Sequence, residues 1–180
     1  METELETLDL KMMEEAMILA RKAGALGEVP IGCVITRNGE IVGRGYNRRE
    51  TGKTALGHAE LMAIDEACRT LGGWRLWQCR LYVTLEPCPM CAGAIINARI
   101  PVVVYGAKDP KAGSVGSVTD LFALPYNHRP QVIGGVLEEP CAQLLRNFFR
   151  ALRQKKKSPG ATANIDKAPI IEYDKQVKDL

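Results

Sequence analysis

The sequence predicts a single layered α/β domain built around a mixed sheet of about five strands. Its 180 residues match the size of one domain, and helical and strand-like apolar patterns alternate along it. Two strand-like runs flank Asn38-Gly39, a dipeptide typical of a tight antiparallel hairpin. Two others, 81–85 and 101–105, are separated by a helix-length segment, which predicts a parallel pair with a right-handed crossover.

The first half of the chain is expected to form a helix, a hairpin and a second helix. Apolar residues 10, 13, 17 and 20 share one helical face, so a helix is expected over 9–23, ending at Gly24. The apolar runs 29–36 and 41–46 should be the two hairpin strands. From His58 the apolar positions are again at helical spacing, and this helix should stop at Gly72-Gly73.

The second half is expected to supply the parallel part of the sheet. A strand at 81–85, a helix at 89–99 and a buried strand at 101–105 precede a glycine-rich loop. A short helix around 119–124 and a weaker strand at 131–133 should follow. The last helix should open at Pro140, and the spacing of its apolar residues predicts burial of Cys141, Leu145, Phe148 and Leu152.

The domain is expected to span residues 1–157, and the linker-like composition that follows marks 158–180 as a C-terminal tail. No apolar run approaches the roughly 18 residues of a membrane span, and the acidic first residues are unlike a signal peptide. We therefore expect a cytoplasmic protein with no membrane partner. Residues 146–157, here called the basic segment, carry six basic residues and no acidic one. Such a segment suits a polyanion such as RNA, although many basic helices are only solvated.

Cysteine usage singles out one pair. Four of the six cysteines stand alone in apolar segments, whereas Cys88 and Cys91 are three residues apart at a helix start. Together with His58 they offer one imidazole and two thiolates, and three protein ligands leave the fourth tetrahedral position open, as in catalytic zinc sites. We predict one Zn²⁺ per subunit, held by His58, Cys88 and Cys91. A structural zinc site with Cys33 or Cys79 as fourth ligand, or a redox pair, are the alternatives.

Glu60 follows His58 by two residues and is predicted to be catalytic. A carboxylate beside the open position can move protons to and from water without binding the metal. The combination His58-Ala59-Glu60 upstream of Pro87-Cys88-Pro89-Met90-Cys91 matches the signature of zinc nucleobase deaminases. A redox pair would leave the His-x-Glu unexplained. The sequence therefore predicts hydrolytic deamination of a nucleobase.

Longer segments extend this match over residues 9–157. They are 27–32 (Gly-Glu-Val-Pro-Ile-Gly), 58–60, 81–93, 104–107, 109–111, 127–129 and 148–150. At these residues the chain resembles the bacterial tRNA-specific adenosine deaminases, the TadA family. The resemblance implies the three-layer α/β/α cytidine-deaminase fold, a homodimer, and conversion of the wobble adenosine of an arginine tRNA anticodon to inosine. Cys33, where alanine is more usual, and the tail depart from the family pattern.

Position by position, the resemblance also implies that seven residues of this chain contact the anticodon stem-loop of the tRNA. They are Asn47, Asp109, Lys111, Asn127, Phe148, Phe149 and Arg153. Three of them have a simpler interpretation. Phe148 has the spacing of a core residue, Arg153 is typical of a solvated helix face, and Asp109-Pro110 is typical of a turn. Two other functions stay open at this point. One is deamination of a small molecule, such as guanine, cytosine or deoxycytidylate, and the other is a non-catalytic zinc and RNA-binding module.

Overall fold

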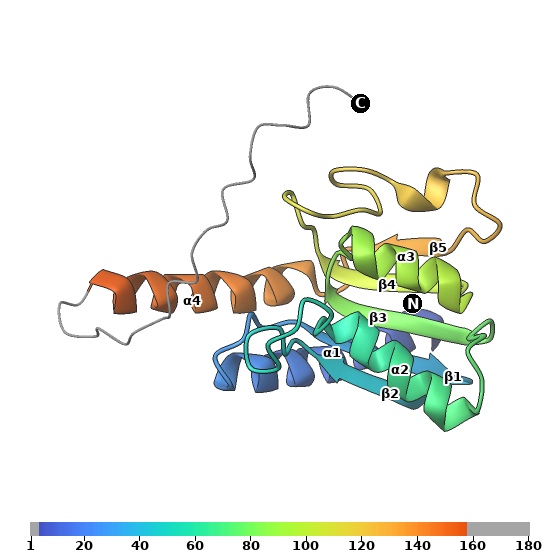
Figure 1. Ribbon diagram of the computed structural model, residues 1–180, viewed down its shortest axis with the longest axis horizontal. Coiled ribbons are helices and arrows are strands. Elements are labelled where there is room, and N and C mark those ends of the chain that lie inside the picture. Colours follow the sequence, from blue (N-terminus) through green and yellow to red (C-terminus); the bar gives the residue numbers. More distant parts are fainter. Residues whose placement is uncertain (1–3, 158–180) are drawn as a thin grey trace, which may run out of the picture.

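The structure, a computed structural model, describes residues 4–157 and is built on a five-stranded mixed sheet (Figure 1). The strands run in the order β2-β1-β3-β4-β5 across the sheet. In chain order they are β1 (Gly32–Arg37), β2 (Glu40–Tyr46), β3 (Cys79–Leu85), β4 (Val102–Ala107) and β5 (Gln131–Gly134). The helices are α1 (Glu4–Ala25), α2 (Ala59–Leu71), α3 (Pro89–Ala98), the 3-10 helix η1 (Leu121–Ala123) and α4 (Glu138–Lys157).

The strand pairings confirm the predicted mixed sheet. β1 pairs antiparallel with β2 and β3, and β4 lies parallel to β3 and β5. Asn38 and Gly39 join β1 to β2 with φ angles of 53° and 82°. Both angles are positive, as a tight hairpin turn with the sheet's natural twist requires. The crossover from β3 through α3 to β4 brings the end of β3 beside the start of α3.

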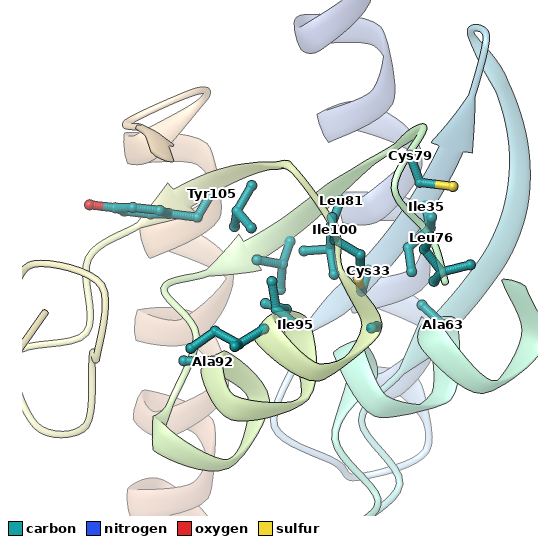
Figure 2. Packing of buried hydrophobic residues seen from close by; sticks show 14 of the residues in the cluster. Cys33, Ile35, Ala63, Leu76, Cys79, Leu81, Ala92, Ile95, Ile100 and Tyr105 are labelled. Carbon is teal, nitrogen blue, oxygen red and sulfur yellow. The ribbon is translucent and has the colours of Figure 1, made fainter. Parts of the chain in front are cut away.

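Helices cover both faces of the sheet because side chains on its central strands alternate between them. Cys33, Ile35, Leu81 and Val103 point toward α2 and α3, and Figure 2 shows the first three packed with Ile95 of α3. The residues between them in sequence, such as Val34 and Tyr82, pack with α1 and with Cys141 of α4 on the opposite face. The fold is therefore three layers, with α2 and α3 on the same face.

Several element limits differ from the prediction. α1 begins at Glu4, five residues before the predicted start at Asp9, and β1 begins at Gly32, because Val29–Ile31 forms a tight turn in which Ile31 N–H donates to Val29 O. The short helix is a 3-10 turn. The C-terminal tail predicted over 158–180 lies outside the described residues.

The predicted burial along α4 is wrong beyond its first turns. Cys141 is buried, but Leu145 and Phe148 are only partly buried and Leu152 is 40% exposed. Figure 1 shows the reason, since the second half of α4 extends past the sheet. Among the helices of residues 4–157, none is long and apolar enough to cross a membrane.

Two glycines on β2 bring α2 directly onto the sheet. A Cβ at Gly45 would lie 2.0 Å from Ala59 O and 2.7 Å from Ala63 N, and one at Gly43 would lie 2.3 Å from Ala63 O. Since backbone atoms cannot give way as a flexible side chain can, the first turn of α2 is seated against bare β2 backbone. That contact sets where His58 and Glu60 lie.

Replacing Gly45 with Ala is expected to push α2 away from β2 and to lower the free energy of unfolding by about 1–3 kcal/mol, the usual cost of overpacking. Urea unfolding would measure the loss. Gly73→Ala is the matched control, because no atom lies within 4 Å of a Cβ at that position. Equal stability of the two variants would contradict this account of the packing.

Candidate active site

The three predicted metal ligands come together where two helices begin. His58 is the N-cap residue of α2, and Cys88 is the N-cap residue of α3, with Pro89 in its first turn. Both cap residues have extended backbone, and neither side chain caps its own helix. The side chains are thus free to converge, and Cys91, one turn into α3, joins them from the buried side.

The donor atoms have the spacing that a tetrahedral zinc ion needs. His58 Nδ1 lies 3.6 Å from Cys88 Sγ and 3.5 Å from Cys91 Sγ, and all three donor atoms lie within 4.8 Å of one another. Zinc bonds of about 2.3 Å to sulfur and 2.0–2.1 Å to nitrogen give a tetrahedral N···S edge of about 3.5 Å. The chemistry and the spacing of the group therefore both fit zinc.

No further His, Cys, Asp or Glu joins this group within residues 4–157. Cys33 and Cys79, the two candidates for a fourth protein ligand, are 0% and 1% exposed and pack in the hydrophobic core (Figure 2). The arrangement has the three-ligand pattern of a catalytic site, not the closed set of a structural one.

The two cysteines of the donor group differ in how readily their thiols ionise. A hydrogen bond from the Cys91 thiol, with further help from the His58 side chain, lowers the pKa of Cys88 to about 4. The same contact with Cys88, together with burial, raises the pKa of Cys91. Hydrogen bonding to Cys88 also raises the pKa of His58. A thiolate is the form in which cysteine binds a metal, so Cys88 presents a ligand already ionised at neutral pH.

Glu60 lies beside this group in the first turn of α2 and is 4% exposed. Burial raises the pKa of its carboxyl to about 7, although hydrogen bonds from its own backbone N–H and from Cys91 oppose the shift. A carboxyl with a pKa near neutrality can both accept and return a proton, as a general acid and base must. Glu60 contacts the ligands without completing the donor group.

A cavity of about 410 Å³ opens over these residues. Its walls come from the segment before β1, the loop after β2, the ends of β3 and β4, and α4. The lining residues are Val29, Ile31, Asn47, Arg49, His58, Ala59, Glu60, Leu85, Glu86, Cys88, Lys108, Asp109, Pro110, Lys111, Ala112, Leu145 and Phe149. The cavity is the size of a ligand pocket, and Glu60 and two of the three predicted metal ligands, His58 and Cys88, line it.

Four of the seven predicted tRNA contacts line this cavity, namely Asn47, Asp109, Lys111 and Phe149. The other three lie outside the lining. Phe148 packs edge-on against Phe149 with ring centroids 5.4 Å apart, Asn127 accepts a hydrogen bond from Arg99, and Arg153 is exposed on α4.

Asn47 and Asp109 also hold the walls of the cavity in place. Asn47 Nδ2 donates to Val29 O at 3.2 Å, and its Oδ1 accepts from Arg49 N–H at 3.3 Å. Asp109 Oδ1 accepts from the N–H groups of Lys111 at 2.9 Å and Ala112 at 3.2 Å. The turn expected at Asp109-Pro110 is therefore present, and the bonds that form it use only one carboxylate oxygen.

Sequence reasoning missed two cationic lining residues, Arg49 and Lys108. A single basic residue in a loop carries no motif, so only its place next to Asn47 or Asp109 offered a signal. With Lys111 they place positive charge on opposite walls of the cavity, where a nucleic-acid backbone would be attracted.

Glu28 was also missed, although it holds the loop that carries Arg49. It is 0% exposed, and its carboxylate accepts hydrogen bonds from Thr51 N–H at 2.6 Å and Glu50 N–H at 3.2 Å. Burial raises the pKa of Glu28, but the hydrogen bonds from Thr51 and Glu50 outweigh burial and leave it below its ordinary value of 4.5. Glu28 is therefore ionised and paired with backbone donors in the folded state.

We expect this pairing to make stability depend on pH. Because the pKa of Glu28 is lower in the folded chain than in the unfolded one, its contribution is present above pH 4.5 and is lost as the pH falls through the lowered pKa. Glu28→Gln should cost about 2 kcal/mol at pH 7, since buried backbone donors lose a charged acceptor. In unfolding titrations the difference from wild type should shrink in acid, and the exposed Glu14→Gln should show little difference at any pH. A deficit that stayed constant with pH would count against this role.

Comparison with known proteins now identifies the family. The MafB19-like deaminase family matches residues 8–153. The tRNA-specific adenosine deaminase of Bacillus subtilis is 52% identical over 153 residues, which cover 84% of this chain and 95% of that protein. The enzyme of the same name from Streptococcus pyogenes serotype M1 is 49% identical, covering 81% of this chain and 85% of its own.

Solved structures agree with the fold and the family. One from a study of A-to-I editing by tRNA:A34 deaminases is 45% identical, with a TM-score of 0.73, and covers 75% of this chain and 99% of that chain. The guanine deaminase of Nitrosomonas europaea, at 24% identity and a TM-score of 0.66 over 77% of this chain and 83% of its own, shows the fold alone. The predicted cytidine-deaminase-like fold is thus confirmed, and the chain is an enzyme that belongs to the family of tRNA-specific adenosine deaminases.

Proposed function

We propose that the chain converts adenosine to inosine by zinc-dependent hydrolysis at the wobble position of a tRNA anticodon, with an arginine tRNA as substrate. The observation that carries the proposal is the placement of Glu60 beside the His58, Cys88 and Cys91 donor group, in the cavity. The names of the relatives support the tRNA substrate. The homodimer and the cytoplasmic location are proposed with it, the former on the family resemblance.

His58, Cys88 and Cys91 would hold one zinc ion per subunit. When bound, zinc supplies a positive charge that lowers the pKa of a water molecule toward neutrality. The protein itself would fix the ligands at the N-terminal ends of α2 and α3 and would hold the Glu60 carboxyl beside them. A site with three protein ligands suits this chemistry because it leaves a position for water.

Glu60 would carry both protons of the attacking water. One goes from water to N1 of the adenine ring, and it remains there in inosine. The other goes to the amino group at C6, which leaves as ammonia as the water oxygen takes its place. Atoms balance, because adenosine and water become inosine and ammonia. The pKa of about 7 for Glu60 suits a group that must accept and release protons in one cycle.

The remaining wall residues would bind the nucleotide. Asn47, already fixed by Val29 and Arg49, presents an amide to the base, and Val29 and Ile31 offer apolar surface to its ring. Asp109 and Lys111 on the opposite wall would contact the ribose and phosphate. An anticodon loop suits this pocket because its bases are already unstacked.

The charges around the cavity favour RNA over a free nucleobase. Arg49, Lys108 and Lys111 line its walls, and so does Phe149, which lies within the basic segment of α4. Phe148, Arg153 and Asn127 lie outside the lining, so they are proposed to meet nucleotides that flank the target. A basic groove combined with exposed aromatic rings is typical of single-stranded RNA binding.

Deamination of a small molecule is the second candidate, because a cavity of about 410 Å³ has the size of a small-ligand pocket. Family membership argues against the third candidate, a module that binds zinc and RNA without turnover.

Two measurements distinguish these three candidate functions. Total tRNA incubated with the enzyme should show A-to-I change at the wobble position of arginine tRNA alone, read by sequencing. Ammonia release should be far faster from an anticodon stem-loop than from adenosine, guanine, cytosine or deoxycytidylate, and the reverse order would establish the second candidate.

A further inference from the structure

A second buried carboxylate lies on the other wall of the cavity. Glu86 follows the last residue of β3 and precedes Pro87-Cys88, so it is two residues from a metal ligand. It is 2% exposed. Its backbone N–H donates to Ala107 O at 2.8 Å, which continues the pairing of β3 with β4 and fixes the main chain at this point. Nothing in the proposed reaction uses its side chain.

The Glu86 carboxylate is surrounded by donors from a single loop, residues 108–117. Oε2 accepts from Asp109 N–H at 3.1 Å and from the hydroxyl of Ser117. Oε1 accepts from Ser117 N–H at 2.9 Å and from Val115 N–H at 3.3 Å. The donors come from both ends of the loop, so one buried anion ties these ends together. Hydrogen bonds to an ionised acceptor are shorter and stronger than neutral ones.

The loop packs directly on this carboxylate. A Cβ at Gly113 would lie 2.4 Å from Cδ and Oε2 of Glu86, so only glycine allows the loop to come this close. A further bond, from Ser114 N–H to Pro87 O at 2.9 Å, joins the loop to the residue beside Cys88. The loop that carries Asp109 and Lys111 is therefore attached to the same segment that carries a metal ligand.

We propose that Glu86 is a positioning residue for the substrate. Its carboxylate fixes loop 108–117 relative to Cys88, so that Asp109 and Lys111 meet the RNA at a set distance from the group where the base reacts. The inference rests on the proposed function, because only that reaction gives Asp109 and Lys111 a substrate. It assigns Glu86 to RNA binding and not to proton transfer, which belongs to Glu60.

Glu86→Gln keeps the size of the side chain but places an amide N–H₂ where donors already point. We expect the KM for an anticodon stem-loop to rise about tenfold, while kcat changes less than about threefold and zinc content stays full. In the enzyme without RNA, amide hydrogen exchange over residues 109–117 should speed up, because the loop has lost its anchor. Glu28→Gln is the matched control, since it removes a buried carboxylate that holds a different loop, the one that carries Arg49, and should leave exchange over 109–117 unchanged.

Two further variants test the same contact from the loop side, away from β3 and the metal ligands. Ser117→Ala removes one of the four hydrogen bonds, that of the hydroxyl, and keeps the one from its N–H, so it should raise KM less than Glu86→Gln does. Gly113→Ala pushes the loop off the carboxylate and should speed exchange as Glu86→Gln does. The double variant Glu86→Gln/Ser117→Ala should be little worse than Glu86→Gln, because both changes disrupt one interaction. These variants also keep the test open if Glu86→Gln does not fold.

Three results would overturn the inference. They are unchanged KM and exchange in the loop variants, loss of zinc in Glu86→Gln, or a fall in kcat with an unchanged KM. Failure of the proposed function is separable from these, since it would be seen as a wild-type enzyme that forms no inosine in the stem-loop. The exchange experiment needs no RNA and would still decide whether Glu86 holds the loop.

Discussion

Replacing Glu60 with Gln is expected to stop inosine formation and to leave zinc and RNA bound. Each general acid or base step contributes typically 10²–10⁴ in rate, and two proton transfers in the proposed reaction depend on this carboxyl. Gln has the same shape but cannot take or return a proton, so turnover should fall by at least about 10⁴. Single-turnover assays on an anticodon stem-loop would measure the rate.

Controls separate a catalytic from a structural role for Glu60. Zinc content by elemental analysis and stem-loop affinity should stay close to wild type, because Glu60 lies beside the donor group and is not part of it. Glu66→Gln, an exposed change on the same helix, should keep full activity. Loss of zinc in Glu60→Gln would make the residue a ligand or a support for one. Ordinary inosine formation would mean that another group moves the protons.

The fold could be predicted because its defining features are local. The Asn38-Gly39 hairpin and the strand, helix and strand of residues 79–107 each rest on a short pattern, and together they order most of the sheet. The length of α1 could not be predicted, since the acidic residues before Asp9 suit a helix start and a loop alike. The exposure of Leu152 could not be predicted either. Periodicity gives the face of a helix, but not how far the sheet beneath it extends.

Some residues of the site could likewise be predicted from the sequence, and others could not. His58, Glu60, Cys88 and Cys91 stand in two short motifs, so their types and spacing were enough to pick them out. Glu28 and Glu86 fall within segments that match the family, but the residues beside them are prolines and apolar residues, and these give no sign that the two carboxylates are buried. Only the long-range hydrogen bonds, to Thr51 in one case and to Ser117 in the other, reveal them as buried anchors. Arg49 and Lys108 were missed for the related reason that an isolated cation has no pattern.

Replacing either cysteine of the donor group with serine is expected to remove zinc and to lower the melting temperature. Serine is a poor zinc ligand, because its hydroxyl does not ionise near neutral pH as the Cys88 thiol does. A ligand that binds only the folded state stabilises it by about 4 kcal/mol at a thousand times its Kd. A bound zinc ion would join the first turns of α2 and α3, so its loss should weaken the packing of both helices on the sheet.

The two substitutions should lower the melting temperature by different amounts, and this difference tests the geometry of the site. Cys91 is 0% exposed and Cys88 is partly exposed, so Cys91→Ser also buries a hydroxyl and should be the less stable variant. Cys68→Ser is the matched control, since it changes a partly buried cysteine of α2 outside the donor group. Chelation should bring wild type and the Cys68→Ser control down toward the Cys88→Ser melting temperature, and added zinc should restore them but not Cys88→Ser. Full metal occupancy in both ligand variants would show that zinc is held elsewhere, because a site reduced to two ligands should not keep it.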